Sequence, residues 1–243
     1  MIRRLIILLL IVGCKETLEP EDCTGVAGGD GSTCLADIDG NFYQTIQIGD
    51  QLWMAENLKV VHYNNGDSLS YPSDENFGSY NKGQYVVYGN DPANADIYGN
   101  LYNYLVISDE RGVCPDGWHV PSDDEWTILT DFIAPAGIDS IIWEHSIAGG
   151  KMKEAGLDHW NYFSDQISSE ATNESGFTGL PGGYRSYNSG VFASLGLISY
   201  FLSSSLNTIE PNIWARRLHF NNSSMTQYGG QKQMGQSIRC LGD

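Results

Sequence analysis

The sequence predicts an α+β domain with few helices and short antiparallel strands. Three observations lead to this prediction. Residues 36–54 have the alternation and turns of a β-hairpin, the central stretch 114–133 carries the signals of a strand followed by a capped helix, and the last part of the chain contains further strand-like segments. A length of 243 residues suits one such domain with additional segments, or two small domains.

The first residues form a processing signal. Arg3-Arg4 supplies a basic start, the apolar run Leu5–Val12 is too short to cross a bilayer, and Gly13-Cys14 follows as in a bacterial lipobox. We therefore expect a lipoprotein signal peptide over residues 1–13 and a lipid on Cys14 that attaches the protein to a membrane. The acidic residues after Cys14 resemble export signals of surface lipoproteins, so the expected location is the cell envelope, at the outer membrane and facing the cell surface. The alternative is an ordinary secretory signal, with Cys14 in a disulfide.

The next segment and the overall charge restrict the partners. Residues 14–35 have the composition of a flexible tether, acidic and then glycine-rich, and we expect the folded domain over 36–243. The chain has 13 Lys and Arg against 30 Asp and Glu, a net charge of −17. Such a surface repels phosphate backbones, which argues against nucleic acid as a partner. We expect no cofactor. Calcium is the one alternative that the acidic surface leaves open, although solubility alone also explains the charge.

Five cysteines are present, and a lipid on Cys14 leaves an even number for disulfides. Cys23, Cys34, Cys114 and Cys240 allow three pairings. Cys23 and Cys34 flank a short glycine-rich segment in which a local bridge forms easily, and this leaves Cys114 to pair with Cys240. A metal site is the alternative, but the spacing lacks the CxxC pair that is typical of cysteine-based metal sites.

Residues 36–54 predict a β-hairpin and a further strand. Asp39-Gly40 is a two-residue turn signal, residues 42–48 alternate apolar and polar side chains, and a second turn precedes the strand at 51–54. The motif Asp37-x-Asp39-Gly40-Asn41 also resembles the start of a calcium-binding loop. We prefer the hairpin, because the chain lacks the later acidic ligands of such a loop.

Residues 63–104 are dominated by Tyr, Asn, Gly, Ser and Asp. This composition resembles that of antibody binding loops, in which rigid tyrosine rings and adaptable polar groups make the contacts. Tyr71, Tyr80, Tyr85 and Tyr88 are therefore candidate ligand-binding residues. The alternative is an irregular surface loop whose tyrosines cover the edge of the core.

The stretch Cys114–Trp126 is expected at the structural centre. Pro115-Asp116-Gly117 predicts a tight turn, Trp118–Val120 predicts a short strand, and Ser122 with Glu125 forms a capping box that starts a helix. Apolar side chains then recur at helical spacing, at Trp126, Leu129 and Phe132/Ile133.

The remaining segments predict short strands and tight turns. Residues 173–185 are glycine-rich without a phosphate-binding motif, which indicates irregular backbone. Residues 194–205, 213–220 and 235–241 have the composition of closing strands, and the last of them ends next to Cys240.

Six motifs occur in the order in which they occur in one protein family. They are Asp39-Gly40-Asn41-x-Tyr43, Ile48-Gly49-x-Gln51-x-Trp53-Met54-Ala55-Glu56-Asn57-Leu58, Tyr98-Gly99-x-Leu101-Tyr102-Asn103, Cys114-Pro115-x-Gly117-Trp118-His119-Val120-Pro121-Ser122-x-x-Glu125-Trp126, Asn173–Phe177 with Leu180–Arg185, and Ser237–Cys240. On these motifs the chain resembles the Fibrobacter succinogenes major paralogous domain (FISUMP) family over residues 36–243. It departs from the family pattern at Leu202-Ser203-Ser204, where the family often has Trp-Ser-Ser.

The resemblance implies a compact, irregular α+β fold akin to C-type-lectin-like and formylglycine-generating-enzyme-like domains. It also implies an exported, often lipid-anchored protein, and it brings no established activity. The first functional hypothesis is a non-catalytic binding or adhesion module for a glycan or a surface protein. Its contact surface would combine the tyrosine-rich loop, residues 63–98, with the segment 207–214. The candidate ligand-binding residues in that second segment are Glu210, Asn212 and Trp214.

Glu210-Pro211-Asn212 also matches a calcium-binding tripeptide of mannose-type C-type lectins. Such a lectin needs a downstream Asn-Asp pair, which the chain lacks after Trp214, so we interpret the match as accidental. The second hypothesis is a structural component of a cell-surface assembly. The third is an oxidase of the formylglycine-generating type, which holds copper with two cysteines near the C-terminus. Only Cys240 lies in that region and no other catalytic motif occurs, so we assign no catalytic residue and do not expect an enzyme.

Overall fold

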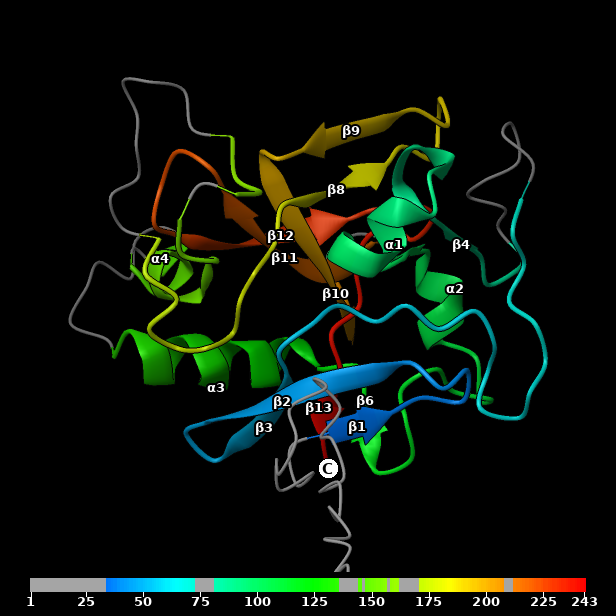
Figure 1. Ribbon diagram of the computed structural model, residues 1–243, viewed down its shortest axis with the longest axis horizontal. Helices are drawn as coiled ribbons and strands as arrows, with labels where there is room; N and C mark the ends of the chain where they lie inside the picture. The colour runs from blue at the N-terminus through cyan, green and yellow to red at the C-terminus, as the bar shows by residue number, and fades with distance from the viewer. Residues whose placement is uncertain are drawn as a thin grey trace, which may run out of the picture. The chain divides into compact units, whose positions relative to one another are not determined.

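The structure of the protein is a computed structural model (Figure 1) that describes residues 34–72, 81–135, 144–145, 147–156, 158–161, 171–207 and 212–243. The chain divides into two compact units, Met1–Ser32 and Thr33–Asp243, and all of the described residues belong to the second. The predicted signal peptide and most of the predicted tether, including Cys14 and Cys23, lie outside the described residues.

A five-stranded sheet brings together segments from the start, the middle and the end of this unit. Its order is β1-β2-β3-β13-β6, with antiparallel pairs throughout. Leu241 pairs with Trp53 on one side and with His119 on the other. The first strand starts at Cys34, ahead of Ala36, where the sequence placed the start of the domain. The strands are β1 (Cys34–Ala36), β2 (Phe42–Ile48), β3 (Gln51–Met54), β6 (Trp118–His119) and β13 (Leu241–Gly242).

The predicted hairpin between β1 and β2 is confirmed. Its turn is closed by Asp37, whose carboxylate accepts hydrogen bonds from the backbone N–H groups of Asp39 and Asn41. The Tyr43 hydroxyl donates to the same carboxylate at 2.6 Å. Asp37 therefore acts as a turn residue that organises its own backbone.

A six-stranded sheet forms the second layer, in the order β7-β12-β11-β10-β8-β9. All its pairs are antiparallel except β8 with β10. The predicted strand at 213–220 corresponds to β11. The predicted strand at 194–205 is β10 from residue 198 on, but its first residues belong to β9 and to the turn before β10. The sequence did not predict β12. The strands are β7 (Glu144–His145), β8 (Gly182–Arg185), β9 (Phe192–Leu195), β10 (Ile198–Leu206), β11 (Ile213–His219) and β12 (Met225–Gly230).

The prediction of one continuous strand over 235–241 is wrong in its first part. Gly235, Gln236 and Ser237 make isolated bridges to three different segments, at Arg185, Tyr102 and Phe201. Because the partner changes at each of these residues, the stretch cannot form the regular hydrogen-bond ladder of a strand. It connects neighbouring layers instead. Only its end, at Leu241, enters a strand.

The helices are few and mostly short, as the predicted fold class requires. The longest in the described part is α3 (Asp123–Ile133), and its predicted capping box is present. Ser122 Oγ accepts from the Glu125 N–H, and the Glu125 carboxylate accepts from the Ser122 N–H at 2.7 Å. The other elements are the two-stranded sheet of β4 (Tyr85–Val86) and β5 (Leu101–Tyr102), the 3-10 turn η1 (Tyr88–Asn90), and the helices α1 (Ala93–Tyr98), α2 (Tyr104–Ile107) and α4 (Ala148–Met152).

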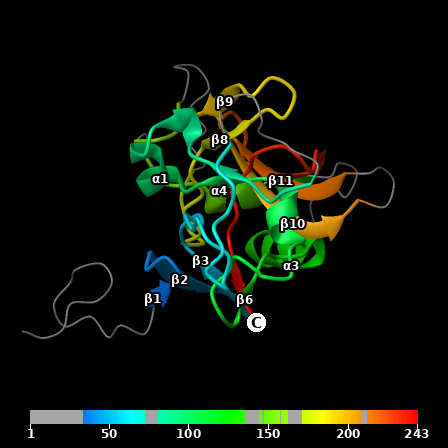
Figure 2. The ribbon, with the colours of Figure 1, turned by 90° about the vertical axis from the view of Figure 1, so that its right-hand side faces the viewer.

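Helix α3 lies between the two large sheets. Figures 1 and 2, which differ by a quarter turn, both place it between β10–β11 and the five-stranded sheet. Trp126 on its inner face is fully buried, with ring centres 4.7 Å from Trp53 of β3 and 5.5 Å from Phe201 of β10. The predicted helix therefore supplies the main aromatic contact between the layers.

A buried hydrophobic cluster surrounds the disulfide between Cys114 and Cys240. This disulfide confirms the predicted pairing of the two cysteines. Leu202 of β10 belongs to this cluster and is fully buried. The position at which the family often has Trp is therefore a core position in this chain. The predicted Cys23–Cys34 pair involves a residue outside the described ones and stays a prediction.

Candidate functional site

The tyrosine-rich segment is folded around the small β4–β5 sheet. Tyr85 of β4 is opposite Tyr102 of β5, and Ser70 lies beside Gln84 in a parallel bridge. The Tyr85 N–H donates to the Ser70 carbonyl at 3.1 Å, which sets Tyr71 next to Tyr85. Tyr102 is fully buried, and its ring centre lies 6.5 Å from that of Tyr85. The backbone pairing therefore gathers tyrosines that are separated in the sequence.

Two of the predicted ligand-binding tyrosines are in ring contact. The rings of Tyr71 and Tyr85 meet edge to face with their centres 5.1 Å apart. Tyr71 is 47% exposed, whereas Tyr85 is half-buried. The Tyr71 hydroxyl donates to the Asn90 side-chain oxygen at 3.3 Å. An exposed ring with an amide at its edge is suited to contacts with a ligand that is both apolar and polar.

The third tyrosine, Tyr88, packs against a residue that the sequence did not suggest. Its ring centre lies 5.2 Å from that of Phe192 on β9, and the guanidinium carbon of Arg185 lies 4.9 Å from the centre of the Phe192 ring. Gly183 permits this approach, because a Cβ there would lie 2.9 Å from the Tyr88 ring and 2.4 Å from the Ala193 carbonyl. We call these two ring pairs, Tyr71–Tyr85 and Tyr88–Phe192, the tyrosine surface; they are connected through η1, which holds both Tyr88 and the Asn90 that Tyr71 contacts.

The hydroxyl of Tyr85 is held in its protonated form. Burial raises the pKa of Tyr85, and the neighbouring Tyr71 and Asp39 raise it further. At neutral pH this hydroxyl can therefore donate a hydrogen bond, and it is far from ionisation. The tyrosine surface therefore offers ring faces together with neutral hydrogen-bonding groups.

The other predicted site residues lie elsewhere. Tyr80 and Glu210 are outside the described residues. Asn212 is 7% exposed at the start of β11, where its backbone carbonyl accepts from the Asn207 N–H. Trp214 is half-buried on β11 opposite Gly229. The tyrosine surface therefore contains three of the predicted residues, together with Phe192 in place of the predicted second segment.

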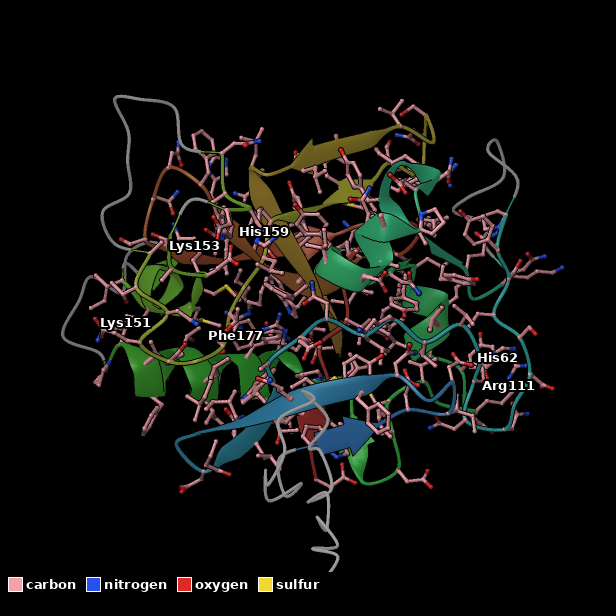
Figure 3. The ribbon with its side chains drawn as sticks, viewed as in Figure 1. His62, Arg111, Lys151, Lys153, His159 and Phe177 are labelled. Atoms are coloured by element: carbon pink, nitrogen blue, oxygen red, sulfur yellow. A yellow bond between two sulfur atoms is a disulfide. The ribbon has the colours of Figure 1, made fainter. Side chains whose placement is uncertain are left out.

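The histidines of the described part are distributed over the fold. Figure 3 shows His62 and His159 well apart, and each pairs with a nearby carboxylate. His119 lies between Asp243, 2.6 Å from Nδ1, and Glu125, 2.9 Å from Nε2. In the described ranges, no group of three His, Cys, Asp or Glu side chains could hold a metal ion.

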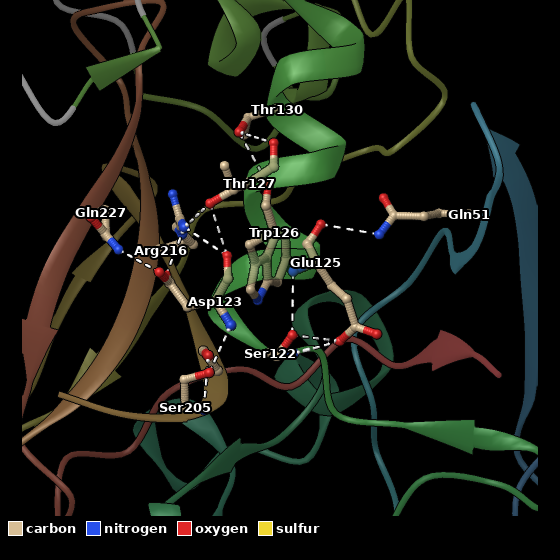
Figure 4. Close-up of polar contacts among 11 residues, drawn as sticks. Gln51, Ser122, Asp123, Glu125, Trp126, Thr127, Thr130, Ser205, Arg216 and Gln227 are labelled. Atoms are coloured by element: carbon tan, nitrogen blue, oxygen red, sulfur yellow. Dashed lines mark hydrogen bonds and ion pairs between the residues drawn. The ribbon is translucent and has the colours of Figure 1, made fainter. Parts of the chain in front are cut away.

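A polar network at the first turn of α3 is the other prominent cluster (Figure 4). Arg216 of β11 donates to the Asp123 carboxylate at 2.6 Å and to the Thr127 hydroxyl at 2.9 Å. Gln227 of β12 donates to the second Asp123 oxygen at 2.6 Å. Arg216 is only 2% exposed, so a ligand in solvent has little access to it. We interpret this network as a structural link between α3 and the six-stranded sheet.

Comparison with protein-family models matches residues 46–241 to the Fibrobacter succinogenes major domain (Fib_succ_major). No curated protein and no solved structure matches the chain. The matched range includes the tyrosine surface, α3 and the disulfide. Within the part of the chain that the structure describes, no helix combines the length and apolar character needed to span a membrane.

Proposed function

The chain belongs to the Fibrobacter succinogenes major domain family, and we propose that it is a lipid-anchored protein of the cell envelope that binds a glycan or a surface protein without catalysing a reaction. The tyrosine surface is the observation that carries this proposal. Family membership adds no activity of its own, so the proposal depends on the chemistry of the exposed side chains.

A glycan fits the tyrosine surface better than a protein partner does. Sugar rings pack their C–H groups on aromatic faces, and their hydroxyls need nearby polar partners. Tyr71 and Asn90 supply these two elements 3.3 Å apart. Tyr85 and Tyr88 are half-buried, so the ring area suits one or two sugar units, whereas a stable protein interface needs roughly 800 Å² on each side.

The location follows from the N-terminus. We propose a diacylated Cys14 that holds the mature chain at the outer membrane, with the domain facing the cell surface. Support comes from the order of basic residues, apolar run and Gly13-Cys14. Cys14→Ser should release the protein from the membrane fraction and remove the lipid mass from the N-terminal peptide. Unchanged membrane association of this variant would overturn the anchor.

The fold relationship to C-type-lectin-like domains is part of the proposal. Its support is the pairing of β13 from the end of the chain with β3 from the start of the domain, inside an irregular α+β fold with a disulfide at its centre. Calcium is not part of the proposed site. Its role is tested directly by comparing binding with calcium and with a chelator.

Two other functions have less support. A structural component of a surface assembly would not need exposed aromatic rings with polar groups beside them. We therefore prefer the binding function. The oxidase hypothesis requires a free cysteine pair near the C-terminus to hold copper. Because Cys240 is bonded to Cys114, that pair is not supported, and we assign no catalytic residue.

A glycan array and a pulldown from surface extracts test the proposal, each with the mature wild-type chain and with Tyr71→Ala and Tyr88→Ala. Phe132→Ala is the matched control, since Phe132 is an exposed ring (60%) on α3, outside the tyrosine surface. We expect a glycan ligand that is retained by Phe132→Ala and lost by Tyr71→Ala. No ligand in either screen would favour the structural-component function, and a protein ligand alone would favour the adhesion form of the proposal.

A further inference from the structure

The six-stranded sheet carries tyrosine and arginine side chains on the face that points away from α3. Phe201 packs against the tryptophan of α3, so its neighbour Tyr200 points to the opposite face, because successive side chains alternate in a strand. Tyr200 is opposite Arg217 of β11. The ring centres of Tyr184 and Tyr228 lie 5.2 and 5.6 Å from that of Tyr200. We call these residues the tyrosine–arginine row: Tyr184, Tyr200, Arg217 and Tyr228.

Arg217 is the charged member of this row. Its guanidinium carbon lies 5.6 Å from the centre of the Tyr228 ring. Among the residues that the structure describes, no carboxylate forms an ion pair with Arg217, whereas Arg111 pairs with both Asp67 and Asp109. In a chain with a net charge of −17, Arg217 is thus one of the cations that no carboxylate of the described residues neutralises.

Arg217 shares its face of the sheet with a histidine. His219 lies two residues further along β11 and therefore points to the same face. Burial lowers the pKa of His219, and the charges of Arg217 and Lys153 lower it further. An anion placed at Arg217 would meet the positive charge of its guanidinium.

The row can be reached from solvent. Tyr184, Arg217 and Tyr228 are half-buried, while Tyr200 is 8% exposed and forms the floor. The Tyr228 hydroxyl donates to the Gln236 side-chain oxygen, which fixes that ring at one end of the row. The rings are thus held by their neighbours, so little side-chain freedom is lost when a ligand binds.

We propose that the tyrosine–arginine row binds an acidic saccharide, a sugar ring that carries a carboxylate or a sulfate group. The planar guanidinium of Arg217 pairs with the anionic group, and the ring of Tyr184 packs against the sugar. An uncharged sugar lacks the first contact, and an inorganic anion lacks the second.

This site is separate from the tyrosine surface. Arg185 is opposite Phe192 and Tyr184 is opposite Ala193, and adjacent residues of β8 point to opposite faces. Phe192 therefore lies on the other face of the β8–β9 pair. The proposal does not depend on ligand binding at Tyr71, and either site can be present without the other.

Isothermal titration of the mature wild-type chain tests the proposal with three probes: an oligogalacturonate, a sulfated galactan oligosaccharide and a neutral galactan oligosaccharide of matched length. We expect one of the acidic probes to bind, with an affinity that falls as salt is added. Arg217→Gln should weaken binding about tenfold or more, because a charge-assisted hydrogen bond is lost. Arg217→Lys keeps the charge, so it should retain part of the affinity and the salt dependence.

Arg111→Gln is the matched control, because it removes the same charge from a residue that is far from the row and already paired. Comparable weakening by Arg111→Gln would overturn the site, since binding would then follow total charge. Equal binding of acidic and neutral probes, or of neither acidic probe, would also overturn it. If Arg217→Gln does not fold, the two single variants Tyr184→Ala and Arg217→Lys are compared instead. Tyr184→Ala should then weaken binding of the acidic probe, and Arg217→Lys should retain part of it.

Discussion

At the scale of single residues, the guanidinium of Arg239 holds together parts of the chain that are distant in sequence. It donates to the Asn57 side-chain oxygen at 2.8 and 3.1 Å and to the Phe177 carbonyl. Its carbon lies 4.1 Å from the centre of the Phe177 ring. Burial lowers the pKa of Arg239 to about 9, so the side chain remains charged at neutral pH. Arg239, which belongs to the last of the family motifs, is therefore a core residue. The buried oxygen atoms around it depend on its N–H groups for their hydrogen bonds.

We predict that Arg239→Ala lowers the free energy of unfolding by about 3 kcal/mol or more, because buried acceptors lose their donors. Arg239→Lys should lose most of the same energy, because an ammonium cannot reproduce the planar fork. Arg111→Ala is the control, since that exposed arginine contacts surface carboxylates and should cost less than about 1 kcal/mol. Urea unfolding measures all three variants, and equal losses for the two alanine variants would contradict the prediction.

His119 gives stability a pH dependence. Burial opposes its protonation, but hydrogen bonds to Asp243 and Glu125 outweigh burial and raise the pKa of His119. A raised pKa in the folded state stabilises the fold below the unfolded pKa of about 6.5, and this stability is lost as pH rises through the folded pKa. The wild type should therefore lose stability from about pH 6.5 upward, by less than about 1 kcal/mol because the group is partly exposed.

The variant His119→Gln should remove this component of the pH dependence. Asp243→Asn should reduce it, because one of the two carboxylates that favour protonation is then neutral. Thermal unfolding between pH 5.5 and 8.5 measures the slopes of the three proteins. A slope in His119→Gln that equals the wild-type slope would show that other groups cause the effect.

At the scale of elements, α3 is fixed by its first turn. Asp123 accepts from Arg216 of β11 and from Gln227 of β12, and its backbone N–H donates to Ser205 Oγ at the end of β10. Three strands of one sheet therefore contact one helix terminus. The orientation of α3 between the two sheets follows from this network together with Trp126.

We predict that Asp123→Ala costs about 3 kcal/mol of unfolding free energy, because Arg216 is left buried without its carboxylate. Asp124→Ala is a close control: Asp124 is exposed in the same helical turn, so its loss removes only the favourable charge at the helix start, worth less than about 1 kcal/mol. Guanidinium unfolding compares the two. Similar costs would mean that the Arg216 pair contributes little.

The sequence predicted those elements whose signals are local. Helix α3 could be found because Ser122, Glu125 and the apolar spacing lie within a dozen residues, and the first hairpin because Asp39-Gly40 marks its turn. β12 could not, because it contains Gly229 and Gly230 and is a strand through its pairing with β11 along its whole length and with β7 at its start. Tertiary pairing decided this element.

The candidate site was predictable in part for the same reason. Composition identified Tyr71, Tyr85 and Tyr88, which lie in one tyrosine-rich segment. It could not identify Phe192, which reaches Tyr88 only through the position of β9 in the sheet. Gly183 was visible as part of a glycine-rich segment, but its role, to let the Tyr88 ring approach, depends on contacts between distant parts of the chain.

At the scale of the whole molecule, the end of the folded unit is connected both to its start and to its middle. β13 pairs with β3 and β6, and the disulfide joins Cys240 to Cys114 across a separation of 126 residues. The disulfide lies in one buried hydrophobic cluster, and the paired residues Leu241 and Trp53 lie in another. The end of the chain is therefore part of the core, and its loss would expose both clusters.

We predict that Cys240→Ala lowers the unfolding free energy by about 2–5 kcal/mol, because a long loop of the unfolded chain is no longer closed. Cys23→Ala, which removes the shorter predicted bridge, should cost less, because the entropy of closing a loop grows with its length. Chemical unfolding under non-reducing conditions measures both, and wild-type stability of Cys240→Ala would contradict the prediction.

The central claim is that the tyrosine surface is the binding site of this protein, and the affinity of Tyr71→Ala for the glycan found by array tests it most directly. Titration calorimetry with the mature wild type, Tyr71→Ala and the control Phe132→Ala gives the three dissociation constants. Loss of an anchoring ring costs about 2 kcal/mol, so Tyr71→Ala should bind about thirtyfold more weakly, with Phe132→Ala unchanged. Wild-type affinity of Tyr71→Ala, in a folded protein, would contradict the claim.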